Sequence, residues 1–332
     1  MKKFRENIWK DDEYSYEAAY GFIPNIHAYL HDEDENDGSG DKNRDCMLVI
    51  PGGGYCMCCQ HEGELPAKVF YEQGMNTFVL TYTTDITMSV PLKKQPLNDI
   101  SRAVRFIRKN AKEYGVEGKK LIICGFSAGG HVCGSLAVHF DDVKDPDPEY
   151  DCISNRPDGA ILSYPVLTSG KFTHEYSILA LVGADAGQDE KDYFSCEKHV
   201  TVNTPPCFLW QTVTDGLVPI ENTYLFAQAL LEKKIPFAHY AFPSGFHGLT
   251  VCNEESLNGW KGEDYCMEQV MLAVNAVKDG KGVRVSEKRR AELIEQFFPK
   301  NPAPAFEWKP DMSLLEDVGC WTKLAKVWME RL

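Results

Sequence analysis

The heptapeptide GFSAGGH occupies residues 125–131 and contains the pattern G-x-S-x-G. A short apolar run, LIIC at residues 121–124, precedes it and favours a buried strand, and residues 132–140 favour a helix. A serine at such a strand-to-helix turn is held with its hydroxyl exposed, and the flanking glycines permit the turn because they lack a Cβ. The stretch therefore predicts a nucleophilic Ser127, although an ordinary glycine-rich turn would explain the same pattern if it stood alone.

Three consecutive glycines follow a predicted strand at residues 47–50, within the sequence PGGGY at residues 51–55. Side chains do not obstruct the backbone N–H groups of such a loop. Acyl transfer needs donors of this kind where the carbonyl oxygen gains negative charge, and each is worth about 3–4 kcal/mol. A phosphate-binding loop is the alternative, but neither G-x-x-x-x-G-K-[ST] nor G-x-G-x-x-G occurs here. The loop therefore favours oxyanion binding.

An acid and a histidine each follow a predicted strand further along the chain. Asp215 comes shortly after the strand-like residues 208–212, and His247 comes shortly after residues 237–242. Taken singly, Asp215 could be a turn residue and His247 a structural histidine. Their joint placement, in the order serine, acid, histidine, favours a site built from Ser127, Asp215 and His247.

Five segments together resemble the acetylesterase and acetylxylan esterase branch of the α/β-hydrolase superfamily, near the BD-FAE and hormone-sensitive-lipase-like esterases. They are PGGGY (51–55), GFSAGGH (125–131), DGAILSYP (158–165), DGLVP (215–219) and FHG (246–248). The resemblance extends over residues 26–249, with a last helix near residues 321–332. Related lipases usually have a histidine before the three glycines. Pro51 stands there in this chain, which favours the carbohydrate-esterase branch.

This resemblance implies an α/β-hydrolase fold, with a mostly parallel central sheet and helices on both faces. It implies that Ser127 is the nucleophile, His247 the general base and Asp215 the acid that orients the base. The backbone N–H groups implied to hold the oxyanion are those of Gly53, Gly54 and Ala128. No cofactor is implied, and the implied substrate is an acetylated sugar such as a xylo-oligosaccharide. A lipase, carboxylesterase, peptidase or arylformamidase on the same scaffold stays open, as does a non-catalytic binding protein.

The composition is typical of a water-soluble enzyme. The 332-residue chain is 43% hydrophobic, which is enough for a sizeable core, and its formal net charge is −14. An acidic chain is a poor partner for nucleic acid or anionic membranes, so we expect a small-molecule or oligosaccharide ester as substrate. No apolar run approaches the roughly 20 residues of a membrane span. The basic residues 1–3 have no apolar segment behind them, so we expect a cytoplasmic protein.

The chain contains twelve cysteines, which we expect to be reduced thiols in a chain this long without an export signal. A metal-like cluster follows the glycine loop. However, structural zinc sites usually have two separated pairs of ligands, and no clear second pair is evident. We therefore expect no metal at the residues of this cluster, which are Cys56, Cys58, Cys59 and His61.

We expect residues 1–332 to form one α/β-hydrolase domain with an insertion at about 252–316, between the histidine loop and the last helix. The insertion has about 65 residues, far more than an ordinary connection, and predicts helices near residues 267–277 and 286–298. Surface decoration, a lid and a dimer surface are the alternatives, so a homo-oligomer stays open. Residues 95–114 predict an amphipathic helix with a solvated basic face, formed by Arg102, Arg105, Arg108 and Lys109.

Overall fold

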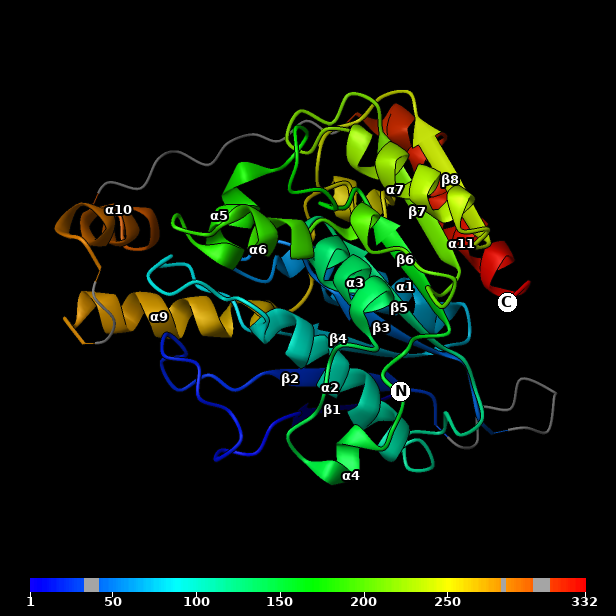
Figure 1. Ribbon diagram of the computed structural model, residues 1–332, viewed down its shortest axis with the longest axis horizontal. Helices are drawn as coiled ribbons and strands as arrows, with labels where there is room; N and C mark the ends of the chain where they lie inside the picture. Colours follow the sequence, from blue (N-terminus) through cyan, green and yellow to red (C-terminus); the bar gives the residue numbers. More distant parts are fainter. Residues whose placement is uncertain (33–41, 282–284, 301–310) are drawn as a thin grey trace.

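The computed structural model describes residues 1–32, 42–281, 285–300 and 311–332. Its centre is an eight-stranded sheet in the order β1-β2-β4-β3-β5-β6-β7-β8 (Figure 1). The strands β3 to β8 run parallel to one another, and β2 pairs antiparallel with both β1 and β4. The predicted mostly parallel sheet is confirmed. The strands are β1 (Lys2–Asn7), β2 (Asn25–Leu30), β3 (Cys46–Ile50), β4 (Asn76–Thr81), β5 (Leu121–Phe126), β6 (Gly159–Ser163), β7 (Cys207–Thr212) and β8 (Phe237–Phe242).

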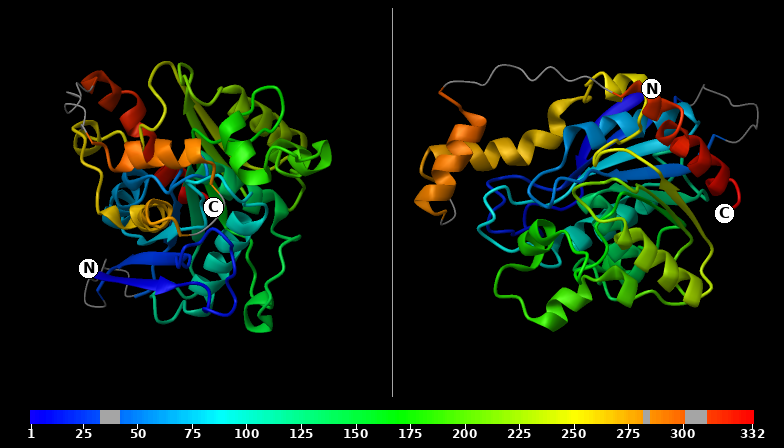
Figure 2. Two further views of the ribbon diagram at one scale, coloured as in Figure 1. Left: turned by 90° about the vertical axis from the view of Figure 1, so that its left-hand side faces the viewer. Right: turned by 90° about the horizontal axis from the view of Figure 1, so that it is seen from above.

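Helices cover both faces of this sheet (Figures 1 and 2). One face carries α1 (Glu64–Glu72) and α11 (Trp321–Met329), which meet through the rings of Phe70 and Trp321. The other face carries α2 (Gln95–Lys109), α3 (Ala128–His139) and α7 (Glu221–Glu232). The central strands β3 to β7 are buried along their whole length. Continuous apolar strands of this kind are typical of a parallel sheet covered on both sides.

Shorter helices lie in the connections between these elements. Before β7 these are α4 (Pro148–Asp151), α5 (Glu175–Val182) and α6 (Gln188–Tyr193), and after β8 they are α8 (Glu254–Leu257), α9 (Glu268–Lys278) and α10 (Glu287–Phe297). Single 3₁₀ turns occupy Gln60–Glu62, Cys196–Lys198, Asp264–Met267, Met312–Leu315 and Val318–Cys320.

The segment predicted as an insertion contains α8, α9 and α10, and the last two project from the body as a pair (Figures 1 and 2). The helix pair α9 and α10 is bonded to the loop after β4. The Gln269 amide donates to the Thr84 carbonyl (2.7 Å) and accepts from the Thr84 N–H (3.0 Å), and the Arg289 guanidinium donates to the Ile86 carbonyl. Ser286 caps α10 through the N–H of Arg289, as a helix starting there requires. Pro302, Pro304 and Pro310 of this segment lie within residues 301–310, outside the described residues.

The prediction that α2 has a solvated basic face is wrong. The helix ends at Lys109 instead of residue 114, and Arg102 and Arg105 are 1% and 4% exposed. The guanidinium of Arg102 forms two hydrogen bonds with the Asp145 carboxylate and a third with Glu13 (2.9 Å). Only Lys109 among the four basic residues is exposed. Segments distant in sequence wrap over this side of α2, and helical periodicity alone does not reveal them.

Candidate active site

The structure places Ser127 at the turn between β5 and α3, with backbone angles φ 53° and ψ −118°. A non-glycine residue in this region carries about 1–3 kcal/mol of strain, so the surroundings must impose it. The Ser127 N–H donates to the Ser163 carbonyl on β6 (3.0 Å), and its own carbonyl accepts from His131 and Val166. The turn is so tight that a Cβ on Gly129 would lie 2.2 Å from the Ile50 carbonyl oxygen. The side chain of Ser127 is thereby presented at the carboxyl end of the sheet.

The three predicted residues Ser127, His247 and Asp215 form a continuous hydrogen-bonded chain. The Nε2 atom of His247 lies 2.8 Å from the Ser127 Oγ, and its Nδ1 atom lies 2.7 Å from the Asp215 Oδ2. The loops after β7 and β8 bring the acid and the histidine to the end of β5, because the carboxyl ends of parallel strands share one edge. A neutral His247 in this arrangement can take a proton from the serine hydroxyl.

The carboxylate of Asp215 is 1% exposed, yet hydrogen bonds from neighbouring protein groups stabilise its charge. Burial raises its pKa, but hydrogen bonds from His247 and from the N–H groups of Val218 and Leu217 outweigh burial and lower the pKa below its ordinary value of 3.8. Asp215 is therefore ionised at neutral pH, and its charge faces the His247 ring. An ionised partner fixes the histidine tautomer that has its free nitrogen toward Ser127.

The glycine loop lies directly against the serine. A Cβ on Gly52 would come within 2.8 Å of the Ser127 Cβ, so only glycine permits this approach. The Gly52 N–H is already used, since it donates to Glu62 Oε2 at 2.7 Å. The N–H groups of Gly53, Gly54 and Ala128 donate to no acceptor within the described part of the chain. Within the described residues these three amides are therefore unpaired, as donors to an oxyanion would have to be.

Sequence reasoning missed two buried groups behind the site. Glu62 is 2% exposed and accepts hydrogen bonds from Gly52 and from the Tyr164 hydroxyl. His131 is fully buried between the Tyr55 hydroxyl and the Phe194 carbonyl, and burial lowers its pKa to about 4. His131 and Tyr164 stand inside the quoted segments 125–131 and 158–165, so their position was visible although their contacts were not. Glu62 gave only one signal, a carboxylate in the segment that follows the glycine loop.

Four aromatic residues near the motifs are candidate walls for the substrate, and three of them are core. Tyr55, Phe126 and Trp210 are at most 1% exposed, whereas Phe246 is 40% exposed. Phe246 and His247 line a cavity of about 510 Å³. Phe246 is therefore the one member of the four that a substrate can contact.

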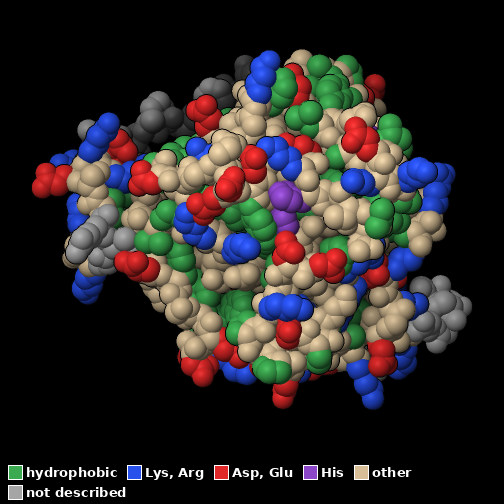
Figure 3. Space-filling view, viewed as in Figure 1, with side chains coloured by type: hydrophobic (Ala, Val, Ile, Leu, Met, Phe, Trp, Pro, Cys, Tyr) green, Lys and Arg blue, Asp and Glu red, His purple; other side chains and the backbone are tan. Residues whose placement is uncertain are grey.

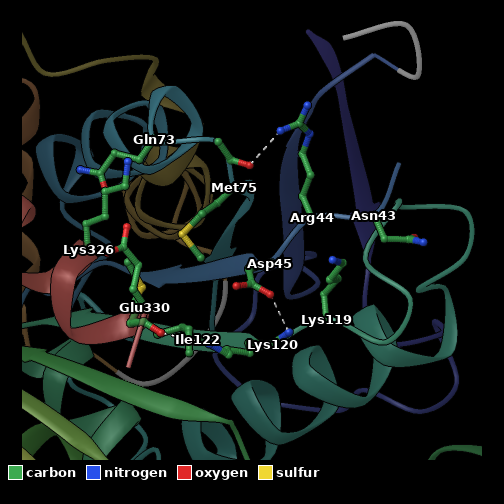
Figure 4. Close-up of a pocket in the computed structure, with 12 residues that line it drawn as sticks. Asn43, Arg44, Asp45, Gln73, Met75, Lys119, Lys120, Ile122, Lys326 and Glu330 are labelled. Carbon is green, nitrogen blue, oxygen red and sulfur yellow. Dashed lines mark hydrogen bonds between the residues drawn. The ribbon is translucent and has the colours of Figure 1, made fainter. Parts of the chain in front are cut away.

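A different cavity, of about 280 Å³, lies at the opposite edge of the sheet (Figure 4). Asp45, which precedes β3, and Lys120, which precedes β5, line it together with Lys326 and Glu330 of the C-terminal segment. In α/β sheets ligands bind at the carboxyl ends of the strands, and this cavity is at the amino ends. It is therefore separate from the Ser127 site.

The remaining sequence expectations concern cysteines, metals and surface charge. All twelve cysteines are free thiols. Within residues 1–32, 42–281, 285–300 and 311–332, no group of three or more histidine, cysteine or acidic side chains is arranged to hold a metal ion. Acidic and basic side chains are interspersed over the face shown in Figure 3. Among the helices that the structure describes, none combines the length and the apolar character needed to cross a bilayer.

Comparison with known proteins places this geometry in a family. The crystal structure of an acetyl ester-xyloside bifunctional hydrolase from Caldicellulosiruptor lactoaceticus superposes with a TM-score of 0.68 at 32% identity, covering 83% of this chain and 96% of that one. The chain belongs to the α/β-hydrolase superfamily. The family model named BD-FAE matches residues 36–158 of this α/β-hydrolase. The predicted resemblance to the acetylesterase and acetylxylan esterase branch is confirmed.

Two curated relatives of this α/β-hydrolase are longer proteins. An endo-1,4-beta-xylanase B of Butyrivibrio fibrisolvens is 68% identical over 277 residues, which are 83% of this chain and 42% of the relative. An acetylxylan esterase of Xylanibacter ruminicola is 28% identical over 211 residues, which are 61% of this chain and 40% of the relative. The chain thus spans about two fifths of the length of each.

Proposed function

We propose that this α/β-hydrolase is a serine esterase that removes acetyl groups from carbohydrates, with acetylated xylo-oligosaccharides as its substrate class. The observation that carries the proposal is the hydrogen-bonded chain from Ser127 through His247 to Asp215. A serine hydroxyl is a weak nucleophile until a base accepts its proton, and this arrangement supplies the base and a third group that orients it.

The first half of the proposed reaction acylates the enzyme. His247 Nε2 takes the hydroxyl proton as Ser127 Oγ attacks the acetyl carbonyl carbon, and Asp215 stabilises the imidazolium that forms. The carbonyl oxygen becomes an oxyanion held by the backbone amides, in the proposal those of Gly53, Gly54 and Ala128. When the tetrahedral intermediate collapses, the bond from the carbonyl carbon to the sugar oxygen breaks. His247 gives its proton to that oxygen, and the sugar leaves as an alcohol.

The second half regenerates the serine. His247 takes a proton from a water molecule as its oxygen attacks the acetyl group on Ser127, and the same amides hold the second oxyanion. Collapse breaks the bond to Ser127 Oγ, which recovers its proton from His247, and acetate is released. No group beyond protein and water is needed for these steps.

The relatives support the choice of an acetylated sugar. One is named an acetylxylan esterase and another an acetyl ester-xyloside bifunctional hydrolase. The relative named as a xylanase suggests a second candidate, cleavage of the glycosidic bond. Glycoside hydrolysis usually employs a pair of carboxylates, whereas the nucleophile proposed here is a serine hydrogen-bonded to a histidine. The geometry therefore favours ester cleavage over glycosidic cleavage.

One set of assays tests this proposal. The purified chain is given 4-nitrophenyl acetate, acetylated xylotriose and unmodified xylan, and released nitrophenol, acetate and reducing ends are measured. We expect acetate release from the first two and no new reducing ends from xylan, with both acetate signals lost in Ser127→Ala. Reducing ends that form equally well in Ser127→Ala would instead support the glycosidase.

The length of the acyl group separates an acetylesterase from a lipase on the same scaffold. A shallow acyl site rejects added methylenes, each of which can be discriminated by about 1–3 kcal/mol. We therefore expect kcat/KM to fall from acetate to butyrate to octanoate esters of the same alcohol. A preference for octanoate would favour a lipase.

A further inference from the structure

The cavity beside His247 is built jointly by the histidine loop and the segment that follows it. Phe246 and His247 form one side, and Ser256, Trp260 and Lys261 of the segment 252–316 form another. His61, next to the glycine loop, completes the wall. At about 510 Å³ the cavity is within the range of small-molecule sites, and far larger than a two-carbon acyl group requires.

Trp260 is exposed but held in place. Its side chain is 41% exposed, and the ammonium group of Lys68 lies 4.6 Å from its ring centre. Lys68 is itself paired with the buried carboxylate of Glu64 at 3.0 Å. A cation at this distance is attracted to an aromatic face, so one face of the indole is supported from α1.

The backbone after Trp260 is tied to α1 and to the 3₁₀ turn that precedes it. The Gln60 amide donates to the Gly262 carbonyl at 2.8 Å, and the N–H of Glu263 donates to Glu64 at 2.7 Å. The Glu263 carboxylate also pairs with Lys3 on β1. These bonds fix the loop before any ligand arrives. A preorganised aromatic surface loses little conformational freedom on binding, which favours a recognition role over a loose decoration.

The lining has the chemical character of a carbohydrate site. Phe246 and Trp260 are 40% and 41% exposed, and both line the cavity that contains His247. A pyranose ring has faces of C–H groups that pack on aromatic rings and an edge of hydroxyl groups that need polar partners. The Ser256 hydroxyl is already used in a capping box with Asn253, but His61 and Lys261 offer such partners around the same cavity. A long acyl chain would find the aromatic walls suitable but would leave these polar groups unpaired.

We propose that this cavity binds the sugar ring whose hydroxyl carries the acetyl group, or the ring next to it, with Trp260 as the stacking surface and Phe246 as the opposing wall. This inference rests on the proposed esterase function and assigns the alcohol part of the substrate to the segment 252–316. The segment thereby sets specificity for an oligosaccharide.

The first test compares Trp260→Ala and Trp260→Phe with the wild type on two acetyl esters. We expect Trp260→Ala to raise KM for acetylated xylotriose about tenfold more than it raises KM for 4-nitrophenyl acetate, a difference of about 1.4 kcal/mol. Trp260→Phe should recover part of the loss. The matched control is Tyr224→Ala, an equally exposed aromatic residue on α7 (46%), which should alter neither KM. Equal effects of Trp260→Ala on both esters would overturn the inference.

The second test measures binding without turnover. Unacetylated xylotriose is titrated into Ser127→Ala and into Ser127→Ala/Trp260→Ala by calorimetry, and we expect the second variant to bind about tenfold more weakly. If the two variants bind xylotriose equally well and the wild type is an active esterase, the sugar site is contradicted but the esterase function is not. Sugar binding that depends on Trp260, in a chain that hydrolyses no acetyl ester, would contradict the esterase alone. A Trp260→Ala defect confined to octanoate esters would show that the cavity holds the acyl chain.

Discussion

The hydroxyl of Tyr164 donates a 2.6 Å hydrogen bond to the buried carboxylate of Glu62, and this contact joins the two loops that carry the site. Glu62 holds the glycine loop by accepting from the Gly52 N–H at 2.7 Å. Tyr164 holds the histidine loop, because its hydroxyl accepts from the Thr250 N–H and its ring meets His247 edge-on at 4.9 Å. The Glu62 carboxylate thus holds the loop of the proposed oxyanion donors directly, and it holds the loop of the proposed base through Tyr164.

We expect Glu62→Gln to lower kcat while leaving KM nearly unchanged. Both partners of Glu62 are donors, so an amide can satisfy one of them and presents its own NH₂ group to the other. An unsatisfied buried donor costs about 1–3 kcal/mol of stability. The misplaced glycine loop should lower kcat by up to about 100-fold, since an error near 1 Å in positioning has that effect. Steady-state kinetics on 4-nitrophenyl acetate and urea unfolding measure the two quantities.

A double-mutant cycle with Tyr164→Phe distinguishes positioning from general destabilisation. Tyr164→Phe removes the hydroxyl and retains the ring against His247. If the two residues act through their shared hydrogen bond, Glu62→Gln/Tyr164→Phe should cost less in kcat than the sum of the single changes. Additive losses in kcat would contradict the coupling of the two loops.

Backbone strain at Ser127 gives a prediction that separates stability from activity. Ser127→Ala and Ser127→Gly should each lower turnover by roughly 10⁴-fold or more, because both remove the proposed nucleophile. Glycine adopts φ 53° without strain, which relieves about 1–3 kcal/mol, and its greater freedom in the unfolded chain offsets about 0.4–1 kcal/mol. Ser127→Gly should therefore be more stable than Ser127→Ala, by a free energy of unfolding on the order of 1 kcal/mol. A less stable Ser127→Gly would mean that the turn stores no strain.

Much of the site could be predicted from sequence because its parts are local. The turn at Ser127, the glycines at residues 52–54 and the loops of Asp215 and His247 each follow one strand, and a parallel sheet brings strand ends together. Glu62 could not be found in this way, because its partner Tyr164 lies 102 residues away. The strand β1 was also missed, since its polar, half-exposed residues at an antiparallel edge lack an apolar pattern.

The burial of Arg102 on α2 also depends on residues distant in sequence, and it gives a further prediction. Its guanidinium faces the Asp145 carboxylate, and both side chains are 1% exposed. The guanidinium also lies 4.1 Å from the ring of Trp9. Arg102→Met should lower the free energy of unfolding by about 3–5 kcal/mol, because it leaves a buried carboxylate unpaired. Urea unfolding tests this, with Lys109→Met as the exposed control that should hardly change stability.

Removing the orphaned charge as well is the complementary experiment. Arg102→Met/Asp145→Leu should be more stable than Arg102→Met, since the second change removes the uncompensated carboxylate. A double variant that is as unstable as the single one would show that the packing of Arg102 matters more than its charge.

His131 is expected to make stability depend on pH below neutrality. Burial lowers its pKa from an ordinary value of 6.5 to about 4, so the folded protein keeps the ring neutral while the unfolded chain protonates it. Between pH 6.5 and about 4, the unfolded chain therefore binds a proton at His131 that the folded protein does not bind. The stability associated with the neutral ring is fully present above pH 6.5 and declines as pH falls toward 4, by about 3 kcal/mol in all. Because the ring accepts from Tyr55 of the glycine loop, the same protonation would also remove the acceptor for the Tyr55 hydroxyl.

The measurement is urea unfolding at several pH values between 7 and 4.5 for the wild type and His131→Asn. Asparagine keeps an acceptor toward the Tyr55 hydroxyl but does not titrate. Other histidines contribute to both proteins, notably His27, whose pKa burial also lowers to about 4. The wild-type slope should therefore exceed that of His131→Asn by up to about one proton. Equal slopes would mean that His131 does not remain neutral in the fold, because a ring that protonates at its ordinary pKa adds nothing to the difference between folded and unfolded states.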